Sequence, residues 1–106
     1  MTADELKLRT KQFALRVIRL VAALPKTIEG RAIASQLVRS GTSVAANYRA
    51  ACRARSRSEF VAKMGVVLEE ADETQLWLEL IIESKLLPVK RVSPCLRKRA
   101  NWSRSL

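Results

Sequence analysis

Apolar positions between Phe60 and Lys85 form more than one row along a helix. The first row alternates steps of four and three residues: Phe60, Met64, Val67, Ala71, Thr74, Leu78 and Ile81. Two further rows lie beside it, one of Val61, Leu68, Gln75 and Ile82, the other of Leu76, Trp77 and Leu80. A helix that covers one small core needs a single stripe, so a helix apolar over much of its girth has to be covered on several sides. This predicts a compact bundle that covers its remaining apolar surface by self-association.

Two more helices precede this one. A stripe of Leu6, Phe13, Val17, Leu20, Val21 and Leu24 predicts a helix from about Thr2 to Leu24, capped by Thr2 or Asp4. Pro25 disfavours helical geometry in the residue before it, so the helix should end there. A second stripe of Ile33, Leu37, Val44, Tyr48 and Ala51 predicts a helix from about Thr27 to Ala54.

The segment Ser40–Ser43 has weak helix propensity and could form a loop. Because the apolar spacing stays in phase across it, a continuous helix is favoured. Its small residues would then mark a close approach between helices, or a face that a partner covers.

The third helix should begin at a cap formed by Ser56 or Ser58 and end near Leu87, because Pro88 follows. Pro94 interrupts the remaining segment, which has no sustained apolar period. We predict an all-α, antiparallel up-and-down helix bundle with three long helices and a short or degenerate fourth. Residues 1–88 would form the bundle domain, and residues 89–106 a basic C-terminal tail with a short or truncated fourth helix.

Charge is unevenly distributed along the chain. Twenty lysines and arginines face ten acids, a formal net charge of +10. No acid lies between Glu29 and Glu59, and none follows Glu83. Such an excess of positive charge favours polyanionic partners.

The residue types exclude most catalytic chemistry. The chain has no histidine, which removes the commonest general base and metal ligand. Cys52 and Cys95 lack a paired metal-binding spacing. The acidic cluster from Glu69 to Glu73 is expected to be solvated or salt-bridged. We therefore predict no enzymatic activity, no metal and no cofactor.

The N-terminal residues show no secretory signal, and no apolar run approaches the length of a membrane span. A cytoplasmic protein without a membrane partner is expected.

Four arginines, Arg49, Arg53, Arg55 and Arg57, are the candidate nucleic-acid-binding residues. Arginine can contact phosphate with two parallel hydrogen bonds. Arg49 and Arg53 are one helical turn apart, and Arg53 and Arg57 would be too if the helix persisted. No aromatic residues are interleaved, so contact with the backbone rather than the bases is expected. The alternative is that these arginines pair with acids of the third helix, in the same subunit or a neighbouring one.

A second set of residues could form a seam between helices or subunits. Arg39, Ser40, Ser43 and Asn47 follow one another at steps of one, three and four. The alternative is that Asn47 satisfies buried polar groups and Tyr48 is a core aromatic whose hydroxyl finds a partner.

The segment from Gln36 to Arg49, together with Arg53–Lys63 and Leu68–Leu78, resembles the bacterial four-helix-bundle proteins encoded in intervening sequences of large-subunit ribosomal RNA genes. The family pattern falls on Gln36, Leu37, Arg39, Ser40, Ser43, Asn47, Phe60 and Lys63. The resemblance covers about Leu6 to Pro88, and the chain departs from the family pattern over Cys95–Leu106.

The resemblance implies an antiparallel four-helix bundle that assembles into a ring, expected to be a pentamer, with no enzymatic activity. The family is also similar to accessory proteins of diversity-generating retroelements, which form basic barrels and bind nucleic acid and reverse transcriptase. The expected oligomer or helix-packing seam is Gln36, Arg39, Ser40, Ser43, Asn47, Phe60, Leu68 and Leu78.

These observations predict a non-catalytic, homo-oligomeric bundle that binds RNA or DNA backbones through its basic surface. The alternative is a structural or adaptor module whose arginines serve subunit assembly or docking of another protein.

Overall fold

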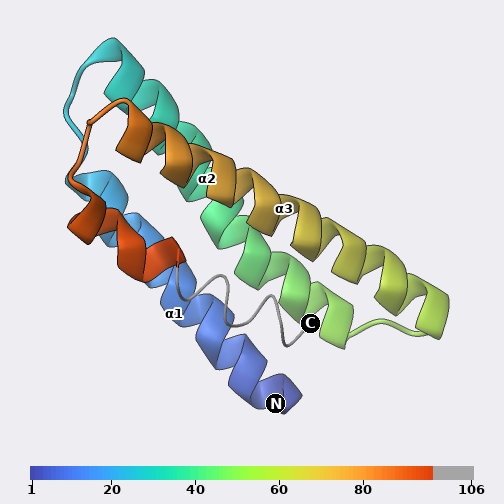
Figure 1. The fold of residues 1–106 in the computed structure, drawn as a ribbon. Helices are drawn as coiled ribbons and strands as arrows, with labels where there is room; N and C mark the ends of the chain where they lie inside the picture. Colours follow the sequence, from blue (N-terminus) through green and yellow to red (C-terminus); the bar gives the residue numbers. More distant parts are fainter. Residues whose placement is uncertain (97–106) are drawn as a thin grey trace.

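Three long helices and one short helix make up the part of the chain that the computed structural model describes, residues 1–96. The long helices are α1 (Ala3–Ala22), α2 (Ile28–Cys52) and α3 (Arg57–Glu83), and the short helix spans residues 89–96. Successive helices run in opposite directions, and the short helix returns beside α1 (Figure 1). α2 packs against both α1 and α3, which have no close backbone pairing with each other. The prediction of an all-α, up-and-down bundle is confirmed.

Each long helix begins at a side-chain cap of the expected type. The hydroxyls of Thr2, Thr27 and Ser56 each accept a hydrogen bond, at 3.1 Å, from the backbone N–H three residues further on, in Glu5, Gly30 and Glu59. These bonds satisfy N–H groups that have no partner inside the helix. The starts of the three helices follow from local sequence.

The segment Ser40–Ser43 is helical, as the apolar spacing predicted. Gly41 is buried against Val17 of α1: a Cβ added at Gly41 would lie only 2.9 Å from Val17 Cγ1. Ser40 is fully buried on the α3 side, where its hydroxyl lies 2.9 Å from that of Thr74. One turn of α2 therefore determines how closely both neighbouring helices pack against it.

The prediction that α3 ends near Leu87 is wrong, because α3 ends at Glu83. Lys85 adopts a left-handed conformation with φ of 61°. The Lys85 N–H donates to Ile82 O at 3.1 Å, and the Leu86 N–H donates to Ile81 O at 3.0 Å. These two bonds form a Schellman turn, a motif that usually has glycine at the left-handed position. A lysine there carries no sequence signal for the end of the helix.

The short helix over 89–96 packs on the core, with Val92 and Cys95 buried. Pro94 lies inside it and does not interrupt it, contrary to the sequence-based expectation. The fixed φ of proline fits a helix, and Lys90, whose carbonyl loses its hydrogen bond, is exposed to water. The rest of the predicted tail, residues 97–106, lies outside the described residues.

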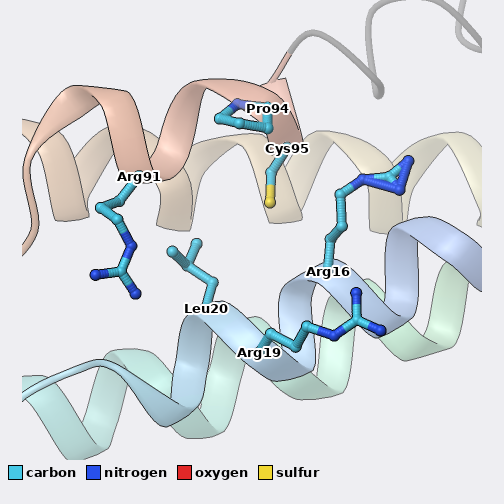
Figure 2. A pocket seen from close by; sticks show the side chains of 6 residues that line it. All are labelled: Arg16, Arg19, Leu20, Arg91, Pro94 and Cys95. Atoms are coloured by element: carbon cyan, nitrogen blue, oxygen red, sulfur yellow. The ribbon is translucent and has the colours of Figure 1, made fainter.

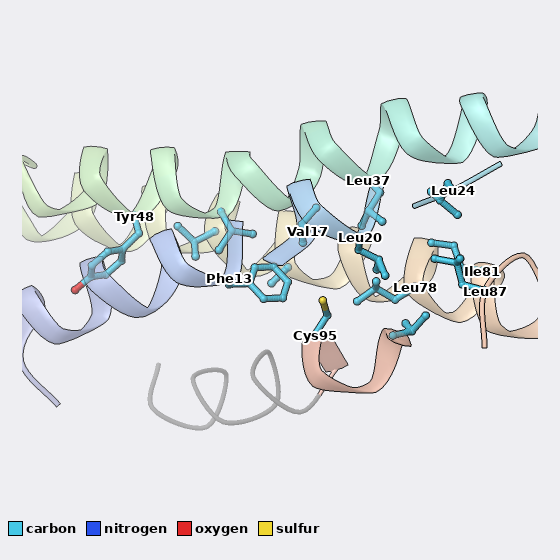
Figure 3. Packing of buried hydrophobic residues seen from close by; sticks show 14 of the residues in the cluster. Phe13, Val17, Leu20, Leu24, Leu37, Tyr48, Leu78, Ile81, Leu87 and Cys95 are labelled. Carbon is cyan, nitrogen blue, oxygen red and sulfur yellow. The ribbon is translucent and has the colours of Figure 1, made fainter. Parts of the chain in front are cut away.

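The core is a continuous cluster of aliphatic side chains together with Phe13, Tyr48 and Cys95 (Figure 3). Phe13, Leu37, Leu78 and Ile81 have no exposed surface, and they come from all three long helices. Tyr48 lies toward the other end of the bundle from Leu24 and Leu87 (Figure 3). Within the described residues the packing thus extends along most of the length of the helices.

Only the first apolar row of α3 is buried along most of its length. Val67, Ala71, Thr74, Leu78 and Ile81 are covered by the described part of the chain. The other two rows remain largely open, with exposed fractions of 59% for Val61, 46% for Leu68, 48% for Leu76 and 38% for Leu80. The outer faces of α3 therefore carry apolar surface that the described part of the chain does not cover, as the sequence predicted.

Gly41→Ala should destabilise the protein, because the added methyl group would overlap Val17, a buried β-branched residue with restricted rotamers. Overpacking costs about 1–3 kcal/mol, and the helix propensity of alanine returns about 1 kcal/mol. Urea unfolding should show a net loss of up to about 2 kcal/mol. The matched control is Gly65→Ala in α3: a Cβ there would meet nothing within 4 Å, and a gain of about 1 kcal/mol is expected. Equal effects at the two positions would contradict this account of Gly41.

The stability of the protein should fall as the pH rises from about 10 to about 12, because burial raises the pKa of the Tyr48 phenol to about 12. An unfolded tyrosine has a pKa near 10, so the stabilisation is complete below pH 10 and is lost toward the folded pKa. Tyr48 is the single tyrosine, so tyrosinate absorbance during alkaline titration reports it directly. The Tyr48→Phe variant should lose less stability than the unmodified protein between about pH 10 and about pH 12. Titration of Tyr48 near pH 10 in the folded protein would contradict the prediction.

Candidate nucleic-acid interface

The four arginines of the predicted nucleic-acid site lie around the connection between α2 and α3. Arg49 is in the last turn of α2, Arg53 is its C-cap, Arg55 is in the connection, and Arg57 is the first residue of α3. All four are exposed. The helix does not persist from Arg53 to Arg57, so these two residues are not one helical turn apart. The chain turns between them, and the connection keeps the four arginines at one end of the bundle (Figure 1). We call this set the arginine run.

No carboxylate of the described residues forms an ion pair with the arginine run. The nearest acid in the sequence, Glu59, is occupied by the backbone: its Oε2 accepts a hydrogen bond from the Arg55 N–H at 3.2 Å. That bond supports the start of α3 together with the Ser56 cap. The guanidinium groups therefore keep their donors available to solvent or to a ligand.

Arg39 behaves in the opposite way. Its Nη1 donates to Glu70 Oε2 at 3.0 Å, and its Nη2 donates to Glu73 Oε1. The Trp77 Nε1–H also donates to Glu73 Oε1, at 3.3 Å. The Arg39 guanidinium lowers the pKa of Glu73, and the same hydrogen bond raises the pKa of Arg39. Arg39 thus links α2 to α3 within one chain, and two members of the acidic cluster are used for that purpose.

The other residues of the predicted seam divide into two groups. Ser40 and Leu78 are buried inside the chain, and the Asn47 amide donates to Ser43 O at 2.9 Å and to Ser43 Oγ at 2.7 Å. Gln36, Phe60 and Leu68 are exposed. The structure therefore places the first group in packing between or along helices and leaves the second group on the surface of the single chain.

Ser40 and Thr74 form a buried polar pair at the centre of the bundle. Thr74 Oγ1 also lies 2.8 Å from Glu70 O, and Ser40 Oγ lies 3.3 Å from Leu37 O. Each hydroxyl has one proton, so one donates to the other and the second donates to a helix carbonyl. Neither group is left unsatisfied, and the pair fixes α2 and α3 in register.

A further basic site was not found from the sequence. Arg16 and Arg19 of α1 and Arg91 of the short helix line a groove between these two helices (Figure 2). Arg91 is 72 or more positions away from the other two in the chain, so no local motif connects them. A sequence signal does exist, because both walls come from stretches that contain no acid, residues 6–28 and residues after 83.

Across residues 1–96, no group of three or more acid, cysteine or histidine side chains is arranged to hold a metal ion. None of the helices in that range is both long enough and apolar enough to cross a bilayer.

No curated protein matches the chain. A crystal structure of a protein of unknown function from the S23 ribosomal protein family of Bacteroides thetaiotaomicron is similar, with 32% sequence identity and a TM-score of 0.87. The similarity covers 95% of this chain and 90% of that one.

The sequence profile described as 23S rRNA-intervening sequence protein matches residues 5–106. This match continues past Pro88, where the resemblance seen in the sequence stopped, and includes Cys95–Leu106. It agrees with the motif around Gln36–Arg49 and with the helical architecture. The chain belongs to the 23S rRNA-intervening sequence protein family.

Proposed function

We propose that this protein is a non-catalytic, homo-oligomeric bundle that binds the phosphate backbone of RNA or DNA through the arginine run. The observation that carries the proposal is the contrast between these arginines and Arg39. Arg39 is neutralised by two carboxylates of its own chain, whereas the arginine run has no carboxylate partner among the described residues. Exposed guanidinium groups without an internal partner are suited to phosphate.

The overall charge supports the same proposal. A net charge of +10 on 106 residues opposes compaction through self-repulsion, and a polyanion relieves that repulsion. The arginine run has no aromatic residues among its members, which favours backbone contacts over base stacking. Binding without sequence readout is expected to have a dissociation constant of roughly 10⁻⁴ to 10⁻⁶ M at physiological salt.

Self-association is supported by the outer faces of α3. Val61 and Leu68 lie on one flank of its buried row, and Leu76 and Leu80 lie on the face away from that row. A stretch of apolar surface along a helix is a common mark of a protein–protein interface. A second copy is the simplest occupant because it is always present at the same concentration.

Replacing Arg53 and Arg55 by glutamine should weaken nucleic-acid binding and reduce its dependence on salt. Each phosphate contact on duplex DNA contributes about −0.9 to the slope of log K against log salt concentration, so two lost contacts reduce the slope by about 1.8. Fluorescence anisotropy with a labelled duplex at several salt concentrations measures this slope. The control is Arg31→Gln, an exposed arginine near the other end of α2, which should change the slope little.

A flat salt dependence for the unmodified protein would remove the nucleic-acid proposal. Charge reversal of Arg53 and Arg55 distinguishes nucleic-acid binding from the adaptor alternative. If the reversed protein loses its assembly while the unmodified protein shows no affinity for nucleic acid, the arginines serve subunit pairing.

The combined change Leu68→Gln and Leu76→Gln should shift the solution mass toward that of a single 11.9 kDa chain. Both side chains are about half exposed in the single chain, so each replacement should change the free energy of unfolding by only about 0.5 kcal/mol. Light scattering measures the mass, and circular dichroism verifies the helices. Ile28→Gln is the matched control, because Ile28 is 89% exposed at the start of α2 and should leave assembly intact. A monodisperse monomer of the unmodified protein in dilute buffer would contradict self-association.

A further inference from the structure

A groove between α1 and the short helix over 89–96 combines an apolar floor with basic walls. It has a volume of about 150 Å³ and is lined by Arg16, Arg19, Leu20, Arg91, Pro94 and Cys95. Figure 2 shows the Cys95 thiol and Leu20 between the two helices, with Arg91 toward one end and Arg16 and Arg19 toward the other. The groove is separate from the arginine run, whose residues come from the α2–α3 connection.

Within residues 1–96, no acid competes for the three guanidinium groups. The lining contains no aspartate or glutamate, and none of the three arginines has an ion pair within the described residues. The stretches that supply the walls, residues 6–28 and 84–96, contain no acid at all. A concentration of three like charges around one groove is unfavourable unless an anion balances it.

Arg16 in addition has a guanidinium donor that no described residue uses. Its Nε is enclosed and has no hydrogen-bond partner among residues 1–96, and its Nη1 makes a long contact of 3.4 Å with Gln12 O. A buried donor without an acceptor is rare and costly. The long side chain can turn toward an acceptor placed in the groove, and this would relieve the unsatisfied donor.

We propose that this groove binds a phosphate group, held by Arg16 and Arg19 from one helix and Arg91 from the other. Phosphate presents several acceptor oxygens and a negative charge, which suits forked guanidinium donors. The floor between the helices is formed by Leu20 and Cys95, which are both buried, so water has little access below the anion and these contacts are strengthened. Because the short helix supplies Arg91, its docking on α1 completes the site.

The experiment titrates the full-length, ¹⁵N-labelled protein with inorganic phosphate at constant ionic strength, balanced with sodium chloride. The arginine Nε–H resonances report each guanidinium separately. Those of Arg16, Arg19 and Arg91 should shift and saturate, while that of Arg31 should not. Arg91→Gln should raise the half-saturating phosphate concentration at least about 10-fold, as expected for loss of a charged hydrogen-bond donor. Arg53→Gln is the matched control and should leave the groove resonances unchanged.

Absence of a saturable shift, or an unchanged half-saturating phosphate concentration in Arg91→Gln, would overturn the proposal. The arginine side chains would then only cover apolar surface. If Arg91→Gln does not fold by circular dichroism, Arg19→Gln, at an exposed position of α1, replaces it with the same expectation. The proposal does not rest on the arginine run. Loss of nucleic-acid binding in the Arg53 and Arg55 variant with intact phosphate binding separates the two sites.

Two further ligands identify where the phosphate comes from. An oligonucleotide with a 5′-phosphate that shifts the groove resonances at lower concentration than its 5′-hydroxyl counterpart assigns the groove to nucleic-acid ends. Equal effects of inorganic phosphate and the phosphorylated oligonucleotide assign it to small phosphates. Both results support a phosphate site.

Discussion

The close approach of three helices at Ser40 and Gly41 of α2 is the constraint on which the bundle depends. Gly41 admits Val17 of α1 at a distance that any side chain would prevent, and Ser40 is hydrogen-bonded to Thr74 of α3. Consecutive residues of a helix point in different directions, so this one turn fixes the positions of two partners. The rest of the core, from Phe13 to Ile81, packs at the spacing that this contact sets.

The same arrangement leaves α3 incompletely covered. Its buried row faces the core, and Arg39 ties its adjacent edge to α2 through Glu70 and Glu73. Those two acids are then unavailable to the arginine run. The molecule therefore presents apolar surface along α3 and unneutralised positive charge at the α2–α3 connection. If copies associate through α3, each adds another arginine run, and several weak phosphate contacts on one assembly would act together.

The candidate sites differ in how far the sequence could find them. The arginine run lies within nine residues, so its clustering could be anticipated from the sequence, whereas its lack of ion pairs with described carboxylates could not. The partners of Arg39 could not, because the acidic cluster offers several carboxylates and only the packing of α3 on α2 selects Glu70 and Glu73. The groove of Arg16, Arg19 and Arg91 depends on two helices that are joined by most of the chain.

The sequence by itself determined the number and starts of the long helices, the helical Ser40–Ser43 segment and the buried row of α3. These depend on caps and apolar spacing, which act within a few residues. Only the tertiary structure decided that α3 stops at Glu83 and that the short helix docks with Val92 and Cys95 buried. Lys85 adopts a left-handed conformation, and Pro94 lies inside a helix, although local preferences oppose both. The burial of Leu87, Val92 and Cys95 offsets these preferences.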